Sequence, residues 1–560
     1  MKRNLLDRAI GAVSPRRLAA RMQARLQVQR MEIAASGLSG YEAAKRQRAS
    51  VRNFNPRART ADEDVLPGLD TLRGQSREMM MNTPLARGAV QTVVTNVVGT
   101  GLRLSSQPDR TGLLAAGAAT EEQIGEFADA AQREWRLFNR KEFCDTDMCL
   151  TLRQMQELTY RTRKVSGDCF VAVVQGNQGS PFDFALQLIE ADRVSNPNRR
   201  ADSDTIAGGI EYDARRKPVA VHVAELSRTG TGPTNWRRLP MRAPDGSPRV
   251  LHLLHRERIG QSRGVPYIAP VIGLLKDLSR ASEAELTATV LNSMIAILGK
   301  SPTGASPLKA EAESAGAGSG GASPGLSRTD IDLEPGLIIE GFNTDETIES
   351  FSPDRPNANF DPFFQAMARQ IGVALELPFE VLIKHFTASY SAARAALLQA
   401  WAFFRVEREA VAREFCQPVY ELVLHNAVLR GRIAASGFLT DAAVRDCWVG
   451  SRWTGPGMGQ IQPQAEIKAA REAVEARLAS RTRMAAEIFG DDWEDTETEL
   501  QWEDGRIASA VSAVSADPAV PQIGHNGGPP MDDDPAASGP QDDPERGDVE
   551  DETLTERTAA

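Results

Sequence analysis

Apolar side chains recur at helical spacing through the stretch 392–422. Six of them follow one another at intervals of three, four or seven residues, which places them on one face of a helix: Leu397, Trp401, Phe404, Val411, Phe415 and Leu422. Upstream, Pro378 lacks an N–H donor and drives Leu377 toward extended geometry. The pattern therefore predicts a helix that stops before Pro378, a loop up to about Ser391, and then a long amphipathic helix that packs against a core.

Helices are also predicted in the first third of the chain. Region 66–99 has helical spacing on both sides of Pro84, and it ends on Gly99 and Gly101, which suit a tight exit from a helix. Two more helices are expected at 121–138 and 150–165. Their apolar faces are formed by Phe127, Trp135, Phe138, Leu152, Met155, Leu158 and Tyr160.

The next section of the chain changes to the pattern of strands. Runs 168–174 and 184–190 are rich in β-branched and aromatic residues and are bounded by Gly and Pro. Residues 209–223 alternate apolar and polar positions on either side of a turn, which is typical of a β-hairpin. Helices followed by such strands predict an α+β domain.

Another helix is predicted from about Pro270, a residue that suits a first turn, to Gly299. Residues 301–328 are low-complexity Gly, Ala, Ser and Pro with little to bury in a core. A strand at 337–342 and a helix beginning at Phe360 then lead back to Pro378. The packing face of the helix that follows Pro270 is made by Leu274, Leu275, Leu278, Leu286, Val290, Met294 and Leu298.

Composition places the chain among ordinary soluble proteins of more than one domain. It has 560 residues, of which 41% are hydrophobic and 25% charged. We expect no signal peptide and no membrane span, because no continuous apolar stretch is long enough. The five cysteines contain no CxxC pair, and an odd count without metal-ligand spacing favours a reducing cytoplasm.

Charge is unevenly distributed within the net charge of −10. The first 60 residues hold fourteen Lys or Arg against three acids, whereas the last 30 are strongly acidic. The basic arm fits two roles, contact with nucleic acid or a solvated helix against neighbouring subunits. Beyond about Ser515 the Pro, Gly and Asp content predicts disorder.

Signatures of catalysis are weak. His252 and His255 are spaced HxxH but lack the glutamate of a zinc protease, and Cys144 and Cys149 lack a second ligand pair. The glycine-rich run 455–459 contains a proline and no following GK[ST], so it is not a P-loop. One carboxylate set could form a two-metal nuclease site, but strand ends and turns explain it more simply: Asp168, Glu190 and Asp192.

Several separated motifs resemble the portal proteins of tailed bacteriophages, specifically the lambda-like branch. These are the sequence ELPFE at 376–380, YSAAR at 390–394 before the long helix, ARGAVQTVVTNVVGTGL at 86–102, and IEADRV at 189–194. The run from Arg452 to Ala470 resembles the family's entry into its crown helices, with Gln462 where an acid is usual. The motifs stand in the family's order across roughly residues 50–500.

The resemblance implies a portal fold, an α+β architecture with a mixed wing, helical stem, small clip, helical crown and disordered tail. On this chain it places a basic N-terminal arm at 1–60, the wing at 61–262, the outer stem helix at 263–300, and the clip with its low-complexity insertion at 301–358. The inner stem helix then falls at 359–376, the tunnel loop at 377–391, a long helix returning to the wing at 392–460, crown helices at 461–514, and the acidic tail at 515–560.

A conduit must pass DNA rather than hold it, and every phosphate neutralised by a cation adds affinity. A neutral or acidic lumen with few basic contacts therefore suits a sliding duplex. On this reasoning the acids of the outer stem helix are candidates for the channel lining, and the tunnel loop supplies the few contacts with DNA. The acids are Asp277, Glu283 and Glu285, and the loop residues are Lys384, His385, Thr387, Ser389 and Tyr390.

One pair of stem helices cannot enclose a duplex, so several copies must close a ring through heterologous contacts. The family implies twelve subunits, non-specific passage of double-stranded DNA, and a place at the capsid vertex of the virion, with assembly in the host cytoplasm. It also implies partners: the terminase large subunit, head-completion proteins at the clip, and major capsid and scaffolding proteins around the wing. No cofactor, metal or enzymatic activity is expected. The alternatives are a metal-dependent DNA-processing enzyme and a non-viral structural ring or adaptor, and a gene-transfer particle would give the same pattern.

Overall fold

The computed structural model describes residues 57–176, 179–225, 235–294, 298–300, 347–349, 359–386, 389–460 and 462–515, with six residues between 20 and 28. Most of the expected arm and clip, the strand expected at 337–342 and the acidic tail lie outside the described residues. The chain divides into two compact units, Met1–Glu494 and Asp495–Ala560. Among the described helices, none has both the length and the apolar character that crossing a membrane requires.

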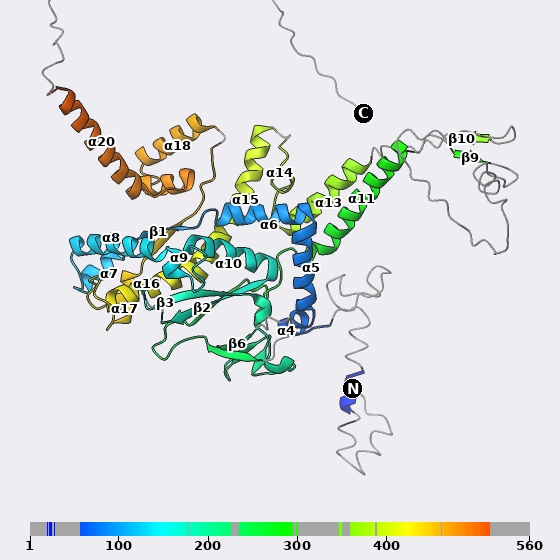
Figure 1. Cartoon of the computed structure of the whole chain (residues 1–560), viewed down its shortest axis with the longest axis horizontal. Helices are drawn as coiled ribbons and strands as arrows, with labels where there is room; N and C mark the ends of the chain where they lie inside the picture. Colours follow the sequence, from blue (N-terminus) through cyan, green and yellow to red (C-terminus); the bar gives the residue numbers. More distant parts are fainter. Residues whose placement is uncertain are drawn as a thin grey trace, which may run out of the picture. The chain divides into compact units, whose positions relative to one another are not determined.

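Helices dominate the first unit (Figure 1). Before the strands of the two larger sheets, β2 to β8, lie α4 (Ala61–Val65), α5 (Leu69–Asn82), α6 (Pro84–Val97), α7 (Arg110–Ala115), α8 (Glu121–Phe138), α9 (Lys141–Cys144) and α10 (Leu152–Ser166). After them come α11 (Ile272–Met294), α13 (Phe360–Ala374), α14 (Phe379–Ile383), α15 (Tyr390–Val411), α16 (Gln417–Leu429), α17 (Ala442–Trp448), α18 (Pro463–Glu475) and α19 (Arg481–Met484). The last helix among the described residues, α20 (Trp493–Ser515), runs into the second unit.

The described strands all pair in antiparallel fashion. A three-stranded sheet has the order β3 (Phe184–Ile189), β2 (Asp168–Gln175), β8 (Val250–Leu254), and a four-stranded sheet has the order β4 (Ile206–Ala207), β5 (Ile210–Tyr212), β6 (Pro218–Ala224), β7 (Trp236–Pro240). Two further pairs join β1 (Arg103–Ser106) to β11 (Ser451–Thr454) and β9 (Leu298–Lys300) to β10 (Thr347–Glu349). The predicted strands at 168–174 and 184–190 and the hairpin at 209–223 are confirmed as β2, β3 and β5–β6.

The three-stranded sheet is the middle layer between helices and the four-stranded sheet. Successive side chains of β2 point to opposite faces. Phe170 and Ala172 pack with Val221 and Val223 of β6 in a small core, whereas Val171 enters the large core formed mainly with the helices. Figure 1 shows the same order, with α10 above β2 and β6 below it. The predicted α+β content is therefore confirmed.

Proline and glycine set the ends of the first helices. Pro84 occupies the first turn of α6, where no N–H is needed, and Thr83 before it is extended, so region 66–99 is two helices rather than one. Gly99 and Gly101 take positive φ values of 56° and 107°. A side chain at Gly99 would collide with Pro456, so the predicted tight exit is confirmed.

The long amphipathic helix is confirmed, with one interruption. Helix α15 leads through a π-helical turn at Ala412–Cys416 into α16, and the predicted apolar face is buried or partly buried along its length. Arg408 fastens α15 to the end of α6, because its guanidinium donates to the carbonyl oxygens of Asn96, Val97 and Pro456 at 2.9–3.1 Å. A cation at a helix C-terminus also interacts favourably with the helix dipole.

Candidate functional site

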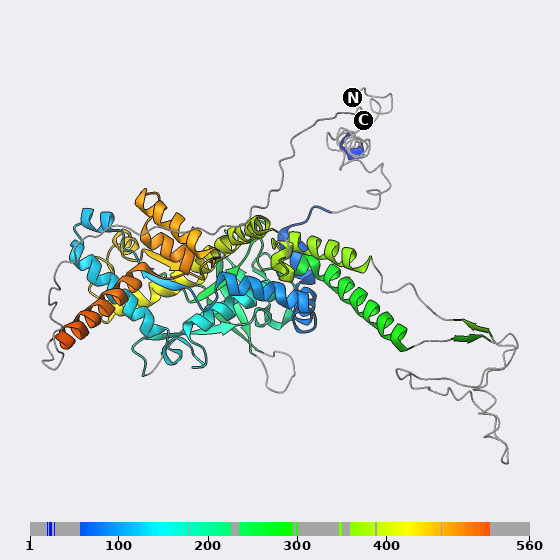
Figure 2. The same ribbon diagram turned by 90° about the horizontal axis from the view of Figure 1, so that it is seen from above.

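Helices α11 and α13 lie side by side and run antiparallel (Figures 1 and 2). Their inner ends are buried, as Leu275 and Leu278 of α11 and Ile371 of α13 show. Further out, Leu286 of α11 is 66% exposed and Phe363 of α13 is 47% exposed. The packing face predicted for α11 is therefore buried only over its first half in a single chain, and the outer half presents apolar side chains to solvent.

The three acids proposed for the channel do not share one face of α11. At 3.6 residues per turn, Asp277 and Glu285 lie roughly 80° apart around the helix, whereas Glu283 lies almost opposite Glu285. Asp277 and Glu283 are exposed, and Glu285 is partly buried. A single channel surface can therefore include Asp277 and Glu285 but cannot include all three acids.

The stretch expected to be a loop between Pro378 and Ser391 contains the short helix α14, so the prediction of a continuous loop was wrong. Pro378 ends one helix but also starts the next, because its carbonyl oxygen accepts from the N–H groups of Val381 and Leu382. Both side chains are buried, and α14 packs against α6, α13 and α15. The chain after Pro378 is thus fixed to the core before it emerges.

Exposed side chains follow α14 directly. Lys384 ends the helix in a left-handed conformation with φ 56°, and the side chains of Lys384, His385 and Phe386 are exposed. Ser389 and Tyr390 are exposed at the start of α15, while Thr387 lies outside the described residues. The structure thus places four of the five predicted loop residues at exposed positions within 384–386 and 389–390, and it adds Phe386, which the polar pattern did not single out.

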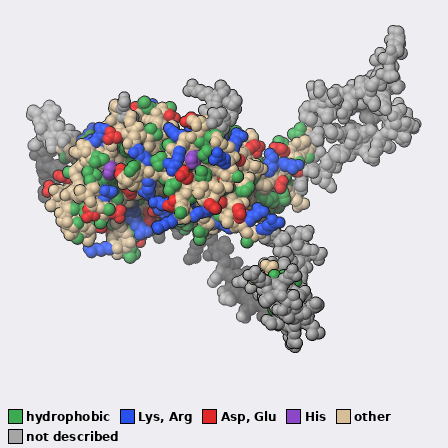
Figure 3. All heavy atoms as spheres, turned by 90° about the horizontal axis from the view of Figure 1, so that it is seen from below, with side chains coloured by type: hydrophobic (Ala, Val, Ile, Leu, Met, Phe, Trp, Pro, Cys, Tyr) green, Lys and Arg blue, Asp and Glu red, His purple; other side chains and the backbone are tan. Residues whose placement is uncertain are grey.

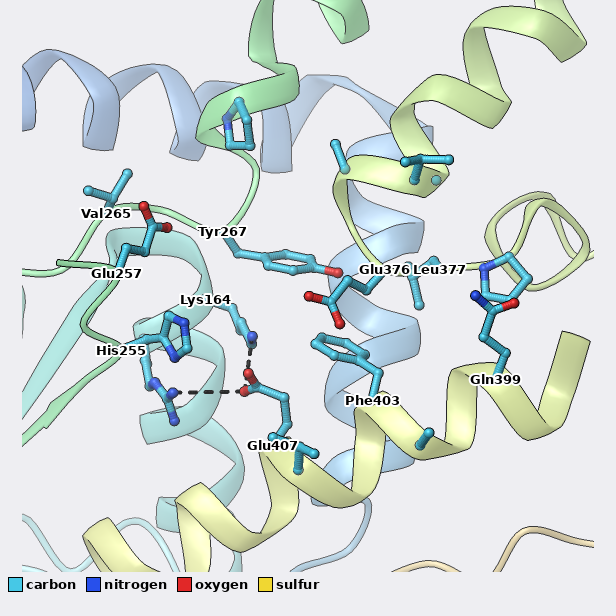
Figure 4. Close-up of a pocket in the computed structure, with 18 of the residues that line it drawn as sticks. Lys164, His255, Glu257, Val265, Tyr267, Glu376, Leu377, Gln399, Phe403 and Glu407 are labelled. Atoms are coloured by element: carbon cyan, nitrogen blue, oxygen red, sulfur yellow. Dashed lines mark ion pairs between the residues drawn. The ribbon is translucent and has the colours of Figure 1, made fainter. Parts of the chain in front are cut away.

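A cavity of about 910 Å³ lies where α10, the segment after β8, the end of α13 and α15 meet (Figure 4). On one side, Lys164 places its ammonium 4.4 Å from the centre of the Tyr267 ring and 5.4 Å from that of Phe403. The two rings are nearly parallel, with an angle of 13° between them. Glu376, which has a left-handed backbone, points toward these rings in Figure 4.

Buried charges line the same cavity. Lys164 Nζ lies 3.0 Å from Glu407 Oε2, the hydroxyl of Tyr160 donates to that carboxylate at 3.0 Å, and Arg163 lies 3.9 Å away. Burial lowers the pKa of Lys164 despite the attraction of Glu407. Burial alone would raise the pKa of Glu407, but Lys164 and Arg163 lower it overall. The lining groups form a paired cluster rather than a nucleophile beside a base, so the cavity has no evident catalytic chemistry.

Asp168, the first member of the carboxylate set, is a structural ion-pair centre. Its side chain is fully buried and accepts from Arg73 at 2.9 Å and from Arg263 at 2.6 and 3.1 Å. The remaining guanidinium hydrogens of Arg263 reach the carbonyl oxygens of Ala191, Val194 and Gly208. Asp168 is therefore engaged by two arginines, which supports the simpler interpretation as a strand end.

The two histidines of the HxxH pair lie in different surroundings. His252 stacks on Phe170 with ring centres 4.1 Å apart, and its Nε2 lies 3.2 Å from Asp168 Oδ2. Burial lowers the pKa of His252 even though Asp168 favours the charged form. His255 is exposed at the cavity. Among the described residues, no group of three or more His, Cys, Asp or Glu is placed to hold a metal ion.

The chain resembles known proteins over most of its length. A family model described as phage portal protein, lambda family, matches residues 47–408. The portal protein of Escherichia phage N15 is 23% identical over 462 residues, covering 80% of this chain and 86% of the relative, and portal protein B of Escherichia phage lambda is 22% identical over 470 residues, covering 80% and 85%.

Solved structures show a weaker likeness. A chain of the virion of a native gene transfer agent particle has a TM-score of 0.39 at 12% identity, covering 75% of this chain and 92% of the other. A chain of the neck of the native particle, computed with C12 symmetry, has a TM-score of 0.38 at 13% identity, covering 75% and 98%.

Proposed function

Because the chain belongs to the lambda family of phage portal proteins, we propose that it forms a ring at the unique capsid vertex, with a central channel for DNA packaging and ejection. The observation that carries this proposal is the exposed outer half of α11 and α13. Leu286, Val290 and Phe363 are between 41% and 66% exposed on these helices. Exposed apolar groups that gather on one feature mark an interaction surface, and a neighbouring subunit of a closed ring would cover them.

The charge of the two helices suits a channel that lets DNA slide. Their exposed and partly exposed charged side chains nearly balance, with four acids and three bases: Asp277, Glu283, Glu285, Asp361, Lys276, Arg280 and Arg369. Lys and Arg are also dispersed among Asp and Glu on the face shown in Figure 3. Few fixed cations facing a duplex would keep its non-specific affinity low.

In this proposal the expected division of the chain is retained: wing at 61–262, outer stem at 263–300, clip at 301–358, inner stem at 359–376 and tunnel loop at 377–391, with α14 inside the loop. The clip would dock the terminase large subunit and later the head-completion proteins, and capsid and scaffolding proteins would surround the wing. Residues 392–460 would return to the wing and 461–514 would form the crown. The enzyme alternative receives no support from Asp168, since two arginines occupy that carboxylate.

We expect the purified full-length chain to form rings with a central hole. Twelve copies of the 60.8 kDa chain would give a particle of roughly 730 kDa. Negative-stain electron microscopy and mass photometry at several salt concentrations test this expectation. A homogeneous monomer or dimer under all conditions would contradict the ring, and metal-dependent cleavage of DNA by that species would favour the enzyme instead.

Contact between the loop and DNA is tested at Lys384. Lys384→Asn removes the charge but tolerates the left-handed backbone, because asparagine adopts that conformation more readily than most residues. We expect DNA binding by the rings to depend less on salt, with the slope of log affinity against log salt shallower by about one for each subunit that touches the duplex. Lys217→Asn, at an exposed position of the β5–β6 hairpin, is the matched control. If the slope of log affinity against log salt is the same for both variants and the native ring, Lys384 does not contact DNA.

A further inference from the structure

The guanidinium of Arg394 joins two helix starts that are distant in sequence. Its Nη1 donates to the hydroxyl oxygen of Tyr390 at 2.9 Å and to Glu466 Oε1 at 2.8 Å. Tyr390 and Arg394 lie one turn apart on α15, whereas Glu466 lies 72 residues further along the chain, in the first turn of α18. One cation therefore bridges the end of the exposed loop and the helix that follows the segment 455–460.

Among the described residues, the N-cap side chain of neither helix makes a capping hydrogen bond. Ser389 at the start of α15 makes no side-chain capping hydrogen bond, and Gln462 at the start of α18 makes none either. The departure of Gln462 from the acid usual in the family thus leaves the cap open without displacing the helix. The N–H groups in the first turn of a helix have no hydrogen-bond partner within that helix. A helix end without a cap therefore frays easily unless other contacts hold it.

The bridge is shielded on the side of α18. The Glu466 side chain is 12% exposed, while that of Arg394 is 37% exposed. An ion pair with one largely buried carboxylate is less screened by salt than a fully exposed pair. Glu466 also lies at the N-terminus of α18, where a negative charge is favourable. The negative charge is therefore favoured at its place on α18, and Arg394 reaches it from α15.

We propose that Arg394 is a positioning residue that links Tyr390 to Glu466 of α18, so that any displacement of α18 is passed to the end of the tunnel loop. The proposal rests on the proposed function for the role of Tyr390, which is the last residue of the DNA-facing set. A shift of α18 would loosen Tyr390 without direct contact between α18 and the loop. The crown region would then adjust how firmly the loop meets DNA in the channel.

Glu466→Gln tests the bridge by a change on α18 alone, because it leaves the sequence of α15 unchanged. Hydrogen exchange measured by mass spectrometry on the full chain should become roughly fivefold faster in residues 389–398, the increase expected when one partly buried ion pair is lost. Glu472→Gln is the matched control, since it removes an exposed acid from the same helix. Arg394→Met removes the other partner, so the double variant Arg394→Met with Glu466→Gln should exchange no faster in these residues than Arg394→Met alone.

Faster exchange confined to α18, or equal acceleration by both glutamine variants, would overturn the proposal. Additive effects of Arg394→Met and Glu466→Gln in the double variant would overturn it as well. The rate of hydrogen exchange in residues 389–398 reports on the bridge whether or not the chain forms a ring. An absence of rings would therefore contradict the proposed function while leaving the coupling between α18 and Tyr390 measurable.

Discussion

Replacing Asp168 by asparagine is expected to lower the free energy of unfolding by about 3–5 kcal/mol, the cost of leaving buried charges without their partner. Arg73 and Arg263 both direct guanidinium groups at this carboxylate, and their side chains are 3% and 2% exposed. The asparagine oxygen keeps one acceptor but carries no charge. Thermal and denaturant unfolding of the purified protein measure the loss, with Asp204→Asn at an exposed loop position as the control.

The Asp168 carboxylate also makes the free energy of unfolding depend on pH, in a direction that can be predicted. Burial opposes ionisation of Asp168, but Arg263, His252 and Arg73 together hold its pKa far below the ordinary value. A depressed folded pKa means that the contribution to stability is complete above the unfolded pKa of about 3.9 and declines as the pH falls below it. The native protein should therefore lose stability more steeply below pH 4 than the Asp168→Asn variant. Parallel curves for the two proteins would contradict the ion-pair account.

Patterns among neighbouring residues were sufficient to predict most of the helices and strands. The apolar face from Leu397 to Leu422 predicted a buried helix because its period of about 3.6 residues is a property of neighbouring positions. Pro84 and Gly99 marked helix ends for equally local reasons. The same proline rule failed at Pro378, because a proline that ends one helix is also favourable at the start of another, and the burial of Val381 and Leu382 decided between the two outcomes.

Contacts between distant residues could not be predicted in this way. Tyr160 and Glu407 are 247 positions apart, and Arg394 and Glu466 are 72 apart, so no spacing rule links them. One signal was available at Glu407. A glutamate three residues after Phe404, on the face that carries the apolar stripe, is expensive to bury unless a cation meets it. That signal predicts a buried ion pair without identifying Lys164 as its partner.

Replacing Glu407 by glutamine is expected to cost about 3–5 kcal/mol of unfolding free energy, because it leaves Lys164 and Arg163 buried beside a neutral amide. The substitution keeps the size of the side chain and an oxygen that can accept from Tyr160. It therefore isolates the charge. Burial already lowers the pKa of Lys164, so loss of the carboxylate should lower it further and favour the neutral amine.

A double-mutant cycle separates this pairing from the loss of packing. Lys164→Met removes the cation but keeps an apolar chain beside the rings of Tyr267 and Phe403, and the double variant then has neither charge. The losses of unfolding free energy in the two single variants should sum to about 1–3 kcal/mol more than the loss in the double variant, as expected for residues in direct contact. Glu409→Gln, two positions along α15 and exposed, is the control and should be near neutral. Additive losses would show that Lys164 and Glu407 do not stabilise each other. Because the pair joins α10 to α15 beside the end of α13, the cost should appear in the unfolding of the whole first unit rather than in local fraying of one helix.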